Sequence, residues 1–173
     1  MKKTIRKIAL SLTVATGLFS FSIGSASAAS DSETLTLPSG YGTLKSDAWR
    51  GSLTTSGNTY KFDYQTSAVY SGSYNVEYIK TTWEVCASLR NSATMSIGIS
   101  STGVTAGAGS TWQNKCDSAY WQNSNGATGA YSERRNAVIK PSVDYRSGTV
   151  SLQNEAKLKI KGDARSWTVN AAT

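Results

Sequence analysis

The chain has 173 residues and carries 18 Lys and Arg against 11 Asp and Glu, with no His at all. The absence of His removes the commonest general base and the commonest transition-metal ligand, so Ser-His-Asp and Cys-His sites cannot be built. Four of the basic residues lie within the first seven positions, and without them the net charge is about +3, which is too small and too scattered for a nucleic-acid-binding protein.

Residues 1–28 have the three parts of an export signal. A cationic start is followed by an apolar, uncharged run over 8–23, and Ala26-Ser27-Ala28 has the small-residue pattern that a signal peptidase cleaves. The apolar run is shorter than the roughly 20 residues that a membrane-spanning helix needs. We therefore expect cleavage between Ala28 and Ala29, and a secreted protein of bacterial type in which 29–173 form a single extracellular domain.

The mature part is rich in Ser, Thr and Tyr, and apolar residues alternate with polar ones in several segments, which is typical of half-buried strands. Turn residues recur about every 8 to 12 residues, as in antiparallel sheets. We therefore predict an all-β fold, a single antiparallel β-sandwich or barrel-like domain. The clearest alternating positions are Tyr60, Phe62 and Tyr64; Ala93, Met95, Ile97 and Ile99; and Leu158 and Ile160.

The segment 74–85 departs from simple alternation. Its apolar positions run through Tyr74, Val76 and Tyr78 and then change parity at Ile79. A shift of one residue turns every later side chain to the opposite face, so the pattern predicts either a β-bulge near 78–79 or a strand covered on both sides.

Cys86 and Cys116 are the two cysteines of the chain. An even pair in an exported protein predicts a disulfide, and no His or neighbouring Cys favours a metal site instead. In the chain-entropy model, the loop that this bond closes corresponds to roughly 3 to 4 kcal/mol of stabilisation.

Between Arg90 and Lys115 the chain carries no charge. We interpret 93–100 and 104–112 as two strands of a hairpin, either an ordinary core hairpin or one that enters a membrane, as pore-forming hairpins do. A core hairpin also has one apolar and one Ser/Thr face, which favours the first interpretation. The membrane-facing side chains of the second would be Met95, Ile97, Ile99, Val104, Ala106 and Ala108.

Five Trp and nine Tyr exceed what a small core usually needs. Tyr120 and Trp121 lie in a polar, turn-rich stretch, so they are the predicted surface contact, because exposed aromatic rings anchor interfaces and stack on sugars. Arg134 and Arg135, near Lys140, form the densest basic cluster along the chain and are expected to lie in a solvated loop.

The sequence contains no Walker loop, dinucleotide-binding fingerprint, EF-hand or nucleophile elbow, so no cofactor, metal or catalytic residue is expected. One alternative remains, a hydrolase that uses only two carboxylates. Its candidate residues are Glu77 and Glu84, or Glu133 and Asp144.

Three functions follow as hypotheses. The first is a secreted, non-enzymatic β-domain that binds cell-wall glycan, matrix or a protein partner. The second is an antimicrobial or toxin-like protein that acts on membranes through 91–114. The third is the carboxylate-only hydrolase.

Overall fold

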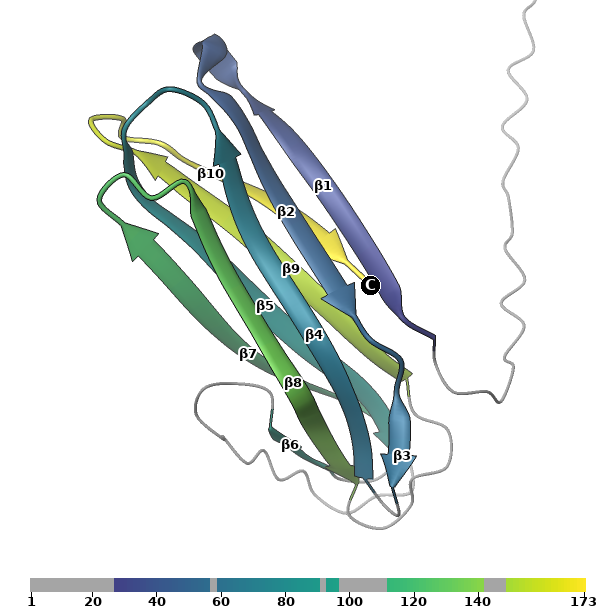
Figure 1. The fold of residues 1–173 in the computed structure, drawn as a ribbon. Coiled ribbons are helices and arrows are strands. Elements are labelled where there is room, and N and C mark those ends of the chain that lie inside the picture. The colour runs from purple at the N-terminus through teal and green to yellow at the C-terminus, as the bar shows by residue number, and fades with distance from the viewer. Residues whose placement is uncertain (1–26, 57–58, 91–92, 97–111, 142–148) are drawn as a thin grey trace, which may run out of the picture.

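The structure, a computed structural model, describes residues 27–56, 59–90, 93–96, 112–141 and 149–173. Apart from one 3-10 turn, η1 (Pro38–Gly40), the regular elements of these residues are strands, which confirms the all-β prediction. The strands form two antiparallel sheets (Figure 1). Sheet A contains, in spatial order, β1 (Ala29–Leu37), β2 (Gly42–Arg50), β4 (Thr59–Ser71), β8 (Gly129–Pro141) and β6 (Ala93–Ser96), and β3 (Thr54–Ser56) pairs with β4. Sheet B contains β10 (Ser166–Ala172), β9 (Thr149–Ile160), β5 (Val76–Arg90) and β7 (Trp112–Ser124).

Alternation in the sequence becomes burial on one face of each sheet. In β4, Tyr60, Phe62 and Tyr64 are buried, whereas Lys61 and the other intervening residues are exposed. The same pattern holds in β9, where Leu158 and Ile160 are buried. Because successive strand side chains point to opposite faces, each of these strands has one dry and one wet side.

The dry faces of the two sheets meet in shared hydrophobic clusters. Tyr64 of β4 and Trp83 of β5 lie in one cluster with ring centroids 6.2 Å apart, and Leu44 of β2 lies in the other with Leu158 of β9. Burial of such large apolar side chains contributes about 1.5–3 kcal/mol each, so these contacts between the sheets supply much of the stability of the fold.

Two bulges shift the pairing of long strands. The register of β5 against β9 shifts between Val76 and Tyr78, which confirms the bulge predicted from the change of parity and places it at Glu77. The register of β4 against β8 also shifts, between Phe62 and Tyr64. The extra residue lies in β8, where Asn136 has a positive φ. Bulges of this kind increase the local twist of a strand and redirect its side chains.

Three expectations for 91–140 have different outcomes. Of the strand predicted over 93–100, the described part, Ala93–Ser96, is a strand, and it pairs with β8. Of the predicted membrane-facing residues Met95 belongs to this strand, whereas Ile97, Ile99, Val104, Ala106 and Ala108 lie outside the described residues, so the hairpin prediction stays a prediction. Arg134 and Arg135 lie within β8, so their placement in a loop was wrong. The strand continues through them because it stays paired with β4 on both sides of the bulge, where Arg134 pairs with Tyr64 and Ala137 with Phe62.

Candidate functional site

A groove on the outer face of sheet A lies between two exposed aromatic side chains. Trp49 of β2 is 37% exposed and Tyr131 of β8 is 64% exposed. Each points outward because its neighbours, Ala48 and Arg50 for Trp49 and Ala130 for Tyr131, occupy the inward positions and are buried. The groove has a volume of about 460 Å³, within the range of small-ligand sites.

The strand register places polar side chains between the two rings. In one cross-strand row Trp49 pairs with Gln65 of β4, which pairs with Glu133 of β8. In the next outward row Asp47 pairs with Ser67, which pairs with Tyr131. Trp49 and Tyr131 are therefore two strands apart and offset by two residues, or about 12 Å from one Cα to the other. We call the four polar side chains between them, Asp47, Gln65, Ser67 and Glu133, the polar floor.

Each aromatic ring lies against a nearby glycine, Gly129 within β8 for Tyr131 and Gly51, directly after β2, for Trp49. A Cβ atom at Gly129 would lie 2.6 Å from Cε2 of Tyr131, so the tyrosine ring covers the backbone at this glycine. A Cβ atom at Gly51 would lie 3.4 Å from the indole of Trp49. β2 and β8 run in the same direction. The ring of Trp49 leans toward the C-terminal end of its strand, and the ring of Tyr131 leans toward the N-terminal end of its strand. The rings therefore diverge and leave the polar floor accessible between them.

Hydrogen bonds fix the polar floor. Gln65 donates from Nε2 to Oε2 of Glu133 at 3.0 Å. The Asp47 carboxylate accepts hydrogen bonds from Ser67 at 2.8 Å and from Ser32 at 2.7 Å, and it forms an ion pair with Lys45 at 2.7 Å. Partial burial raises the pKa of Asp47, but these bonds and the Lys45 charge outweigh it and hold the pKa below its usual value. Asp47 is therefore a permanent acceptor at neutral pH.

The geometry of the carboxylates bears on the hydrolase hypothesis. The bulge puts Glu77 and Glu84 on the same outer face of sheet B, but six to seven strand residues separate them by about 20 Å. A glycosidase pair lies roughly 5 to 10 Å apart, so these two do not form one. Glu133 lies in the groove with Asp47, whose lowered pKa is the opposite of what a general acid requires. Asp144 lies outside the described residues.

Tyr120 and Trp121, the predicted surface contact, are both exposed, at 62% and 45%. As consecutive residues of β7 they point to opposite faces: Tyr120 pairs with Thr82 on the outer side of sheet B, and Trp121 pairs with buried Thr81. Trp121 donates from its indole to Asn123 at 3.1 Å. The structure therefore does not bring the two rings together on one surface, and their role as a contact stays a prediction.

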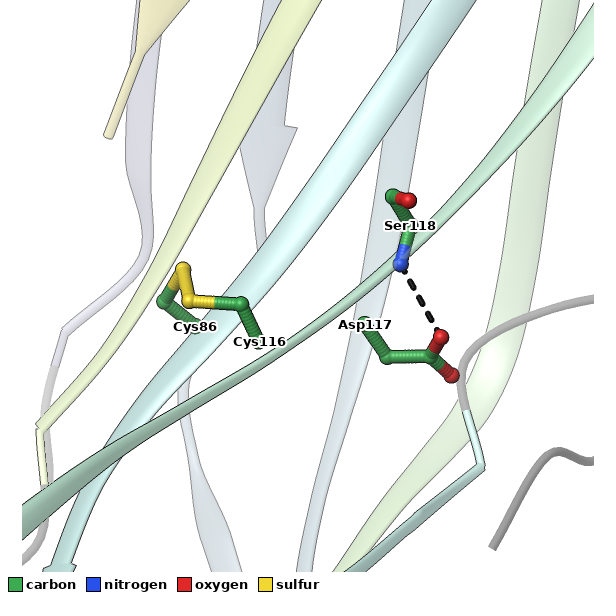
Figure 2. The surroundings of a disulfide bond; sticks show 4 residues. All are labelled: Cys86, Cys116, Asp117 and Ser118. Atoms are coloured by element: carbon green, nitrogen blue, oxygen red, sulfur yellow. Dashed lines mark hydrogen bonds between the residues drawn. A yellow bond between two sulfur atoms is a disulfide. The ribbon is translucent and has the colours of Figure 1, made fainter. Parts of the chain in front are cut away.

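The disulfide joins β5 to β7, as predicted (Figure 2). Cys86 and Cys116 are directly opposite in the register and face the outer side of sheet B, whereas the neighbouring Asp117 points to the other side of β7. Their sulfur atoms and the Glu84 carboxylate are the one group of three metal-ligand atoms that lie close together in the described part of the chain. Because metal binding needs thiolates, this group does not bind a metal while the disulfide is intact.

The alternation within β2 and β8 carries a signal for the groove. Trp49 shares its alternate positions with Lys45 and Asp47, and Tyr131 shares its positions with Glu133. An aromatic residue with the same parity as charged residues belongs to the wet face of a strand. The order β2-β4-β8, which brings the two rings to one groove, was not accessible from this local pattern.

The chain was also compared with known proteins. No family model matches it, and no curated protein matches its sequence.

Proposed function

We propose that this chain is a secreted, non-enzymatic β-sandwich protein that binds a polysaccharide of the cell surface in the groove between Trp49 and Tyr131. The observation that carries the proposal is the pair of exposed rings on either side of a hydrogen-bonded polar floor. Cell-wall glycan is the partner of the three initial possibilities that this chemistry fits best.

A sugar ring presents two kinds of surface, and the groove matches both. The C–H groups on its faces carry partial positive charge and pack on the negative π-face of an aromatic ring. Trp49 and Tyr131 offer such faces. Its hydroxyl groups donate and accept hydrogen bonds, for which Asp47 and Glu133 supply acceptors and Gln65 supplies both kinds of group. Because the floor is already fixed by its own hydrogen bonds, little side-chain entropy is lost when a glycan binds.

Two features, the start of the first strand and the disulfide, support an extracellular location. The first strand begins at Ala29, so cleavage after Ala28 would leave every described strand intact. The disulfide is consistent with an oxidising compartment. No helix among the described residues is long and apolar enough to cross a membrane.

The test is a pull-down of the oxidised mature protein on purified, insoluble cell-wall polysaccharide, quantified as bound fraction against polysaccharide concentration. Loss of one stacked ring removes about 1 kcal/mol or more, so Trp49→Ala and Tyr131→Ala should each weaken binding about fivefold or more. The matched controls are Trp121→Ala and Tyr120→Ala, which remove rings of similar exposure from the other sheet and should change binding less than about twofold.

Two outcomes would overturn the proposal. The parent protein could fail to bind the polysaccharide, or the β7 controls could weaken binding as much as the groove variants, which would move the contact to Tyr120 and Trp121. The same samples test the two other hypotheses. Release of new reducing ends by the parent protein would establish a hydrolase, and dye release from anionic liposomes would establish a membrane-active protein.

A further inference from the structure

The outer face of sheet B gathers lysines that are far apart in the sequence. Lys80 of β5 lies directly opposite Lys157 of β9 in the strand register. Lys159, the next outward residue of β9, lies opposite Tyr78, and Lys161 follows β9 with an exposed side chain. We call these four residues the lysine row. It forms through strand pairing and is therefore not visible along the sequence, in which Arg134 and Arg135 are the densest basic cluster.

Fold stability does not account for the lysine row. Like charges directly opposite each other on paired strands are destabilising, and Lys80 and Lys157 form no ion pair in the described part of the chain. Lys80 lies over the ring of Tyr120, with Nζ 5.1 Å from the ring centre. This cation–π contact is favourable, but it does not neutralise the positive charge of Lys80.

Acidic residues offset the lysine row only in part. Lys159 contacts Glu77 at 3.8 Å, a long and half-exposed ion pair. Glu155, the preceding outward residue of β9, lies opposite Thr82 and next to Lys157 along the strand. Glu84 lies two outward positions from Lys80 along β5. Four positive charges against these three negative ones leave the surface with a net positive charge of about one. The carboxylates of the polar floor lie on the outer face of sheet A, on the opposite side of the molecule.

We propose that the lysine row is a second binding site, for a linear polyanion that carries phosphate groups at intervals along its chain. Lys157 and Lys159 stand at alternate positions of β9, about 7 Å apart, and Lys161 follows directly after the strand end, so the three form a line rather than a compact cluster. A line of cations fits a chain of repeated anionic groups. Lysine suits phosphate as a point charge that needs no fixed geometry.

A polymer fits this surface better than an anionic membrane. Binding at a lipid surface depends on apolar side chains that enter the headgroup region as well as on charge. On the outer face of sheet B the large exposed ring is Tyr120, which lies under Lys80. Tyr78, opposite Lys159, is half-buried, and other neighbours of the lysine row, such as Gln122 and Thr168, are polar. This surface can attract phosphate but has little with which to enter lipid.

The experiment measures binding of long-chain inorganic polyphosphate to the oxidised mature protein in about 50 mM salt, where charge contacts are strong. Lys80→Gln/Lys157→Gln should weaken binding at least about tenfold, and raising the salt to about 200 mM should weaken the parent by a similar factor. The matched control, Lys61→Gln/Lys140→Gln, removes the same charge from exposed positions on sheet A and should change binding less than about threefold.

Folding is monitored in parallel by thermal unfolding, and the lysine-row double variant should be at least as stable as the parent, because a repulsive pair is removed. Three results would overturn the proposal: no binding of polyphosphate by the parent, equal losses in the two double variants, or binding to phosphatidylglycerol vesicles without binding to polyphosphate. Trp49→Ala should bind polyphosphate like the parent, so the outcome for this site is independent of the groove.

Discussion

Asn154 of β9 donates a hydrogen bond from Nδ2 to the backbone carbonyl of Ser67 in β4, at 2.8 Å, across the interface between the two sheets. The same amide group also contacts the carbonyl of Asp47 at 3.1 Å and the hydroxyl of Ser46 at 3.0 Å. The side-chain oxygen accepts a bond of 2.6 Å from Thr81. One buried side chain therefore holds, from inside, the backbone that carries Asp47 and Ser67 of the polar floor.

Replacement of Asn154 by Ala should destabilise the protein by about 2 to 4 kcal/mol. The change leaves several buried polar groups without partners, and each such group costs about 1–3 kcal/mol unless the structure relaxes. Chemical denaturation of the variant measures the loss. The control is Gln153→Ala, which removes an exposed amide from the next position of the same strand and should change the free energy of unfolding by less than about 0.5 kcal/mol. An equal effect of the two changes would contradict the buried network.

The carboxylate of Asp47 should make stability depend on pH in the acidic range. Its folded-state pKa is lowered from the reference value of 3.8, so it binds protons less readily in the folded than in the unfolded protein. Its contribution is therefore fully present above the unfolded-state pKa and is lost as the pH falls through the folded-state pKa.

Asp47→Asn should accordingly be less stable than the parent at pH 7, by at most about 1 kcal/mol for so exposed a group, and the difference should shrink below about pH 4. Unfolding curves of both proteins between neutral and strongly acidic pH provide the measurement. Glu33→Gln removes an exposed carboxylate of β1 as the control for net charge. A difference that stays constant over the whole pH range would be inconsistent with titration of Asp47.

Local features of the fold could be predicted because they depend on the pattern of residues within a single strand. The burial of Tyr60, Phe62 and Tyr64 follows from alternation alone. The change of parity before Ile79 predicted either a bulge or a strand covered on both sides, and the register shift shows the bulge. The disulfide followed from the presence of two cysteines in a chain with an export signal. In each case a property of neighbouring residues, or of one pair, determined the structure.

The candidate sites could not be predicted because they depend on which strands pair and in what register. Trp49 and Tyr131 are 82 residues apart, and only the order β2-β4-β8 puts them on one surface. Lys80 and Lys157 meet for the same reason. Tyr120 and Trp121 show the converse, because residues adjacent in sequence are separated onto opposite faces when they lie in a strand.

The disulfide should be accessible to reductant in the folded protein, because both cysteines face the outer side of sheet B and Cys116 is exposed. Its loop spans 30 residues, so reduction should lower the free energy of unfolding by about 3 to 4 kcal/mol in the chain-entropy model. Thermal unfolding with and without dithiothreitol measures the effect. Cys86→Ala/Cys116→Ala should unfold at the same temperature in both conditions, and a parent protein insensitive to reductant would contradict the prediction.

Two glycines with similar backbone angles should respond differently to a methyl group. Gly42 and Gly126 have φ values of 97° and 85°, which L-residues rarely adopt. A Cβ atom at Gly126 would have no atom within 4 Å, whereas at Gly42 it would collide with the carbonyl oxygen of Ser71 and approach Cα of Gly72 to 2.8 Å. Backbone strain is therefore common to both positions, and steric overlap is specific to Gly42.

Gly126→Ala should cost about 1 kcal/mol, the usual penalty for a left-handed conformation. Gly42→Ala should cost about 3 kcal/mol or more, because the added atom meets backbone that is held by the pairing of β2 with β4 and cannot rotate away. Urea denaturation of the two variants compares them directly. Gly40→Ala, with a φ of 71° and open space around the new atom, should match Gly126→Ala. If all three variants lost the same stability, strain alone would explain the result and the close contact between β2 and the end of β4 would be wrong.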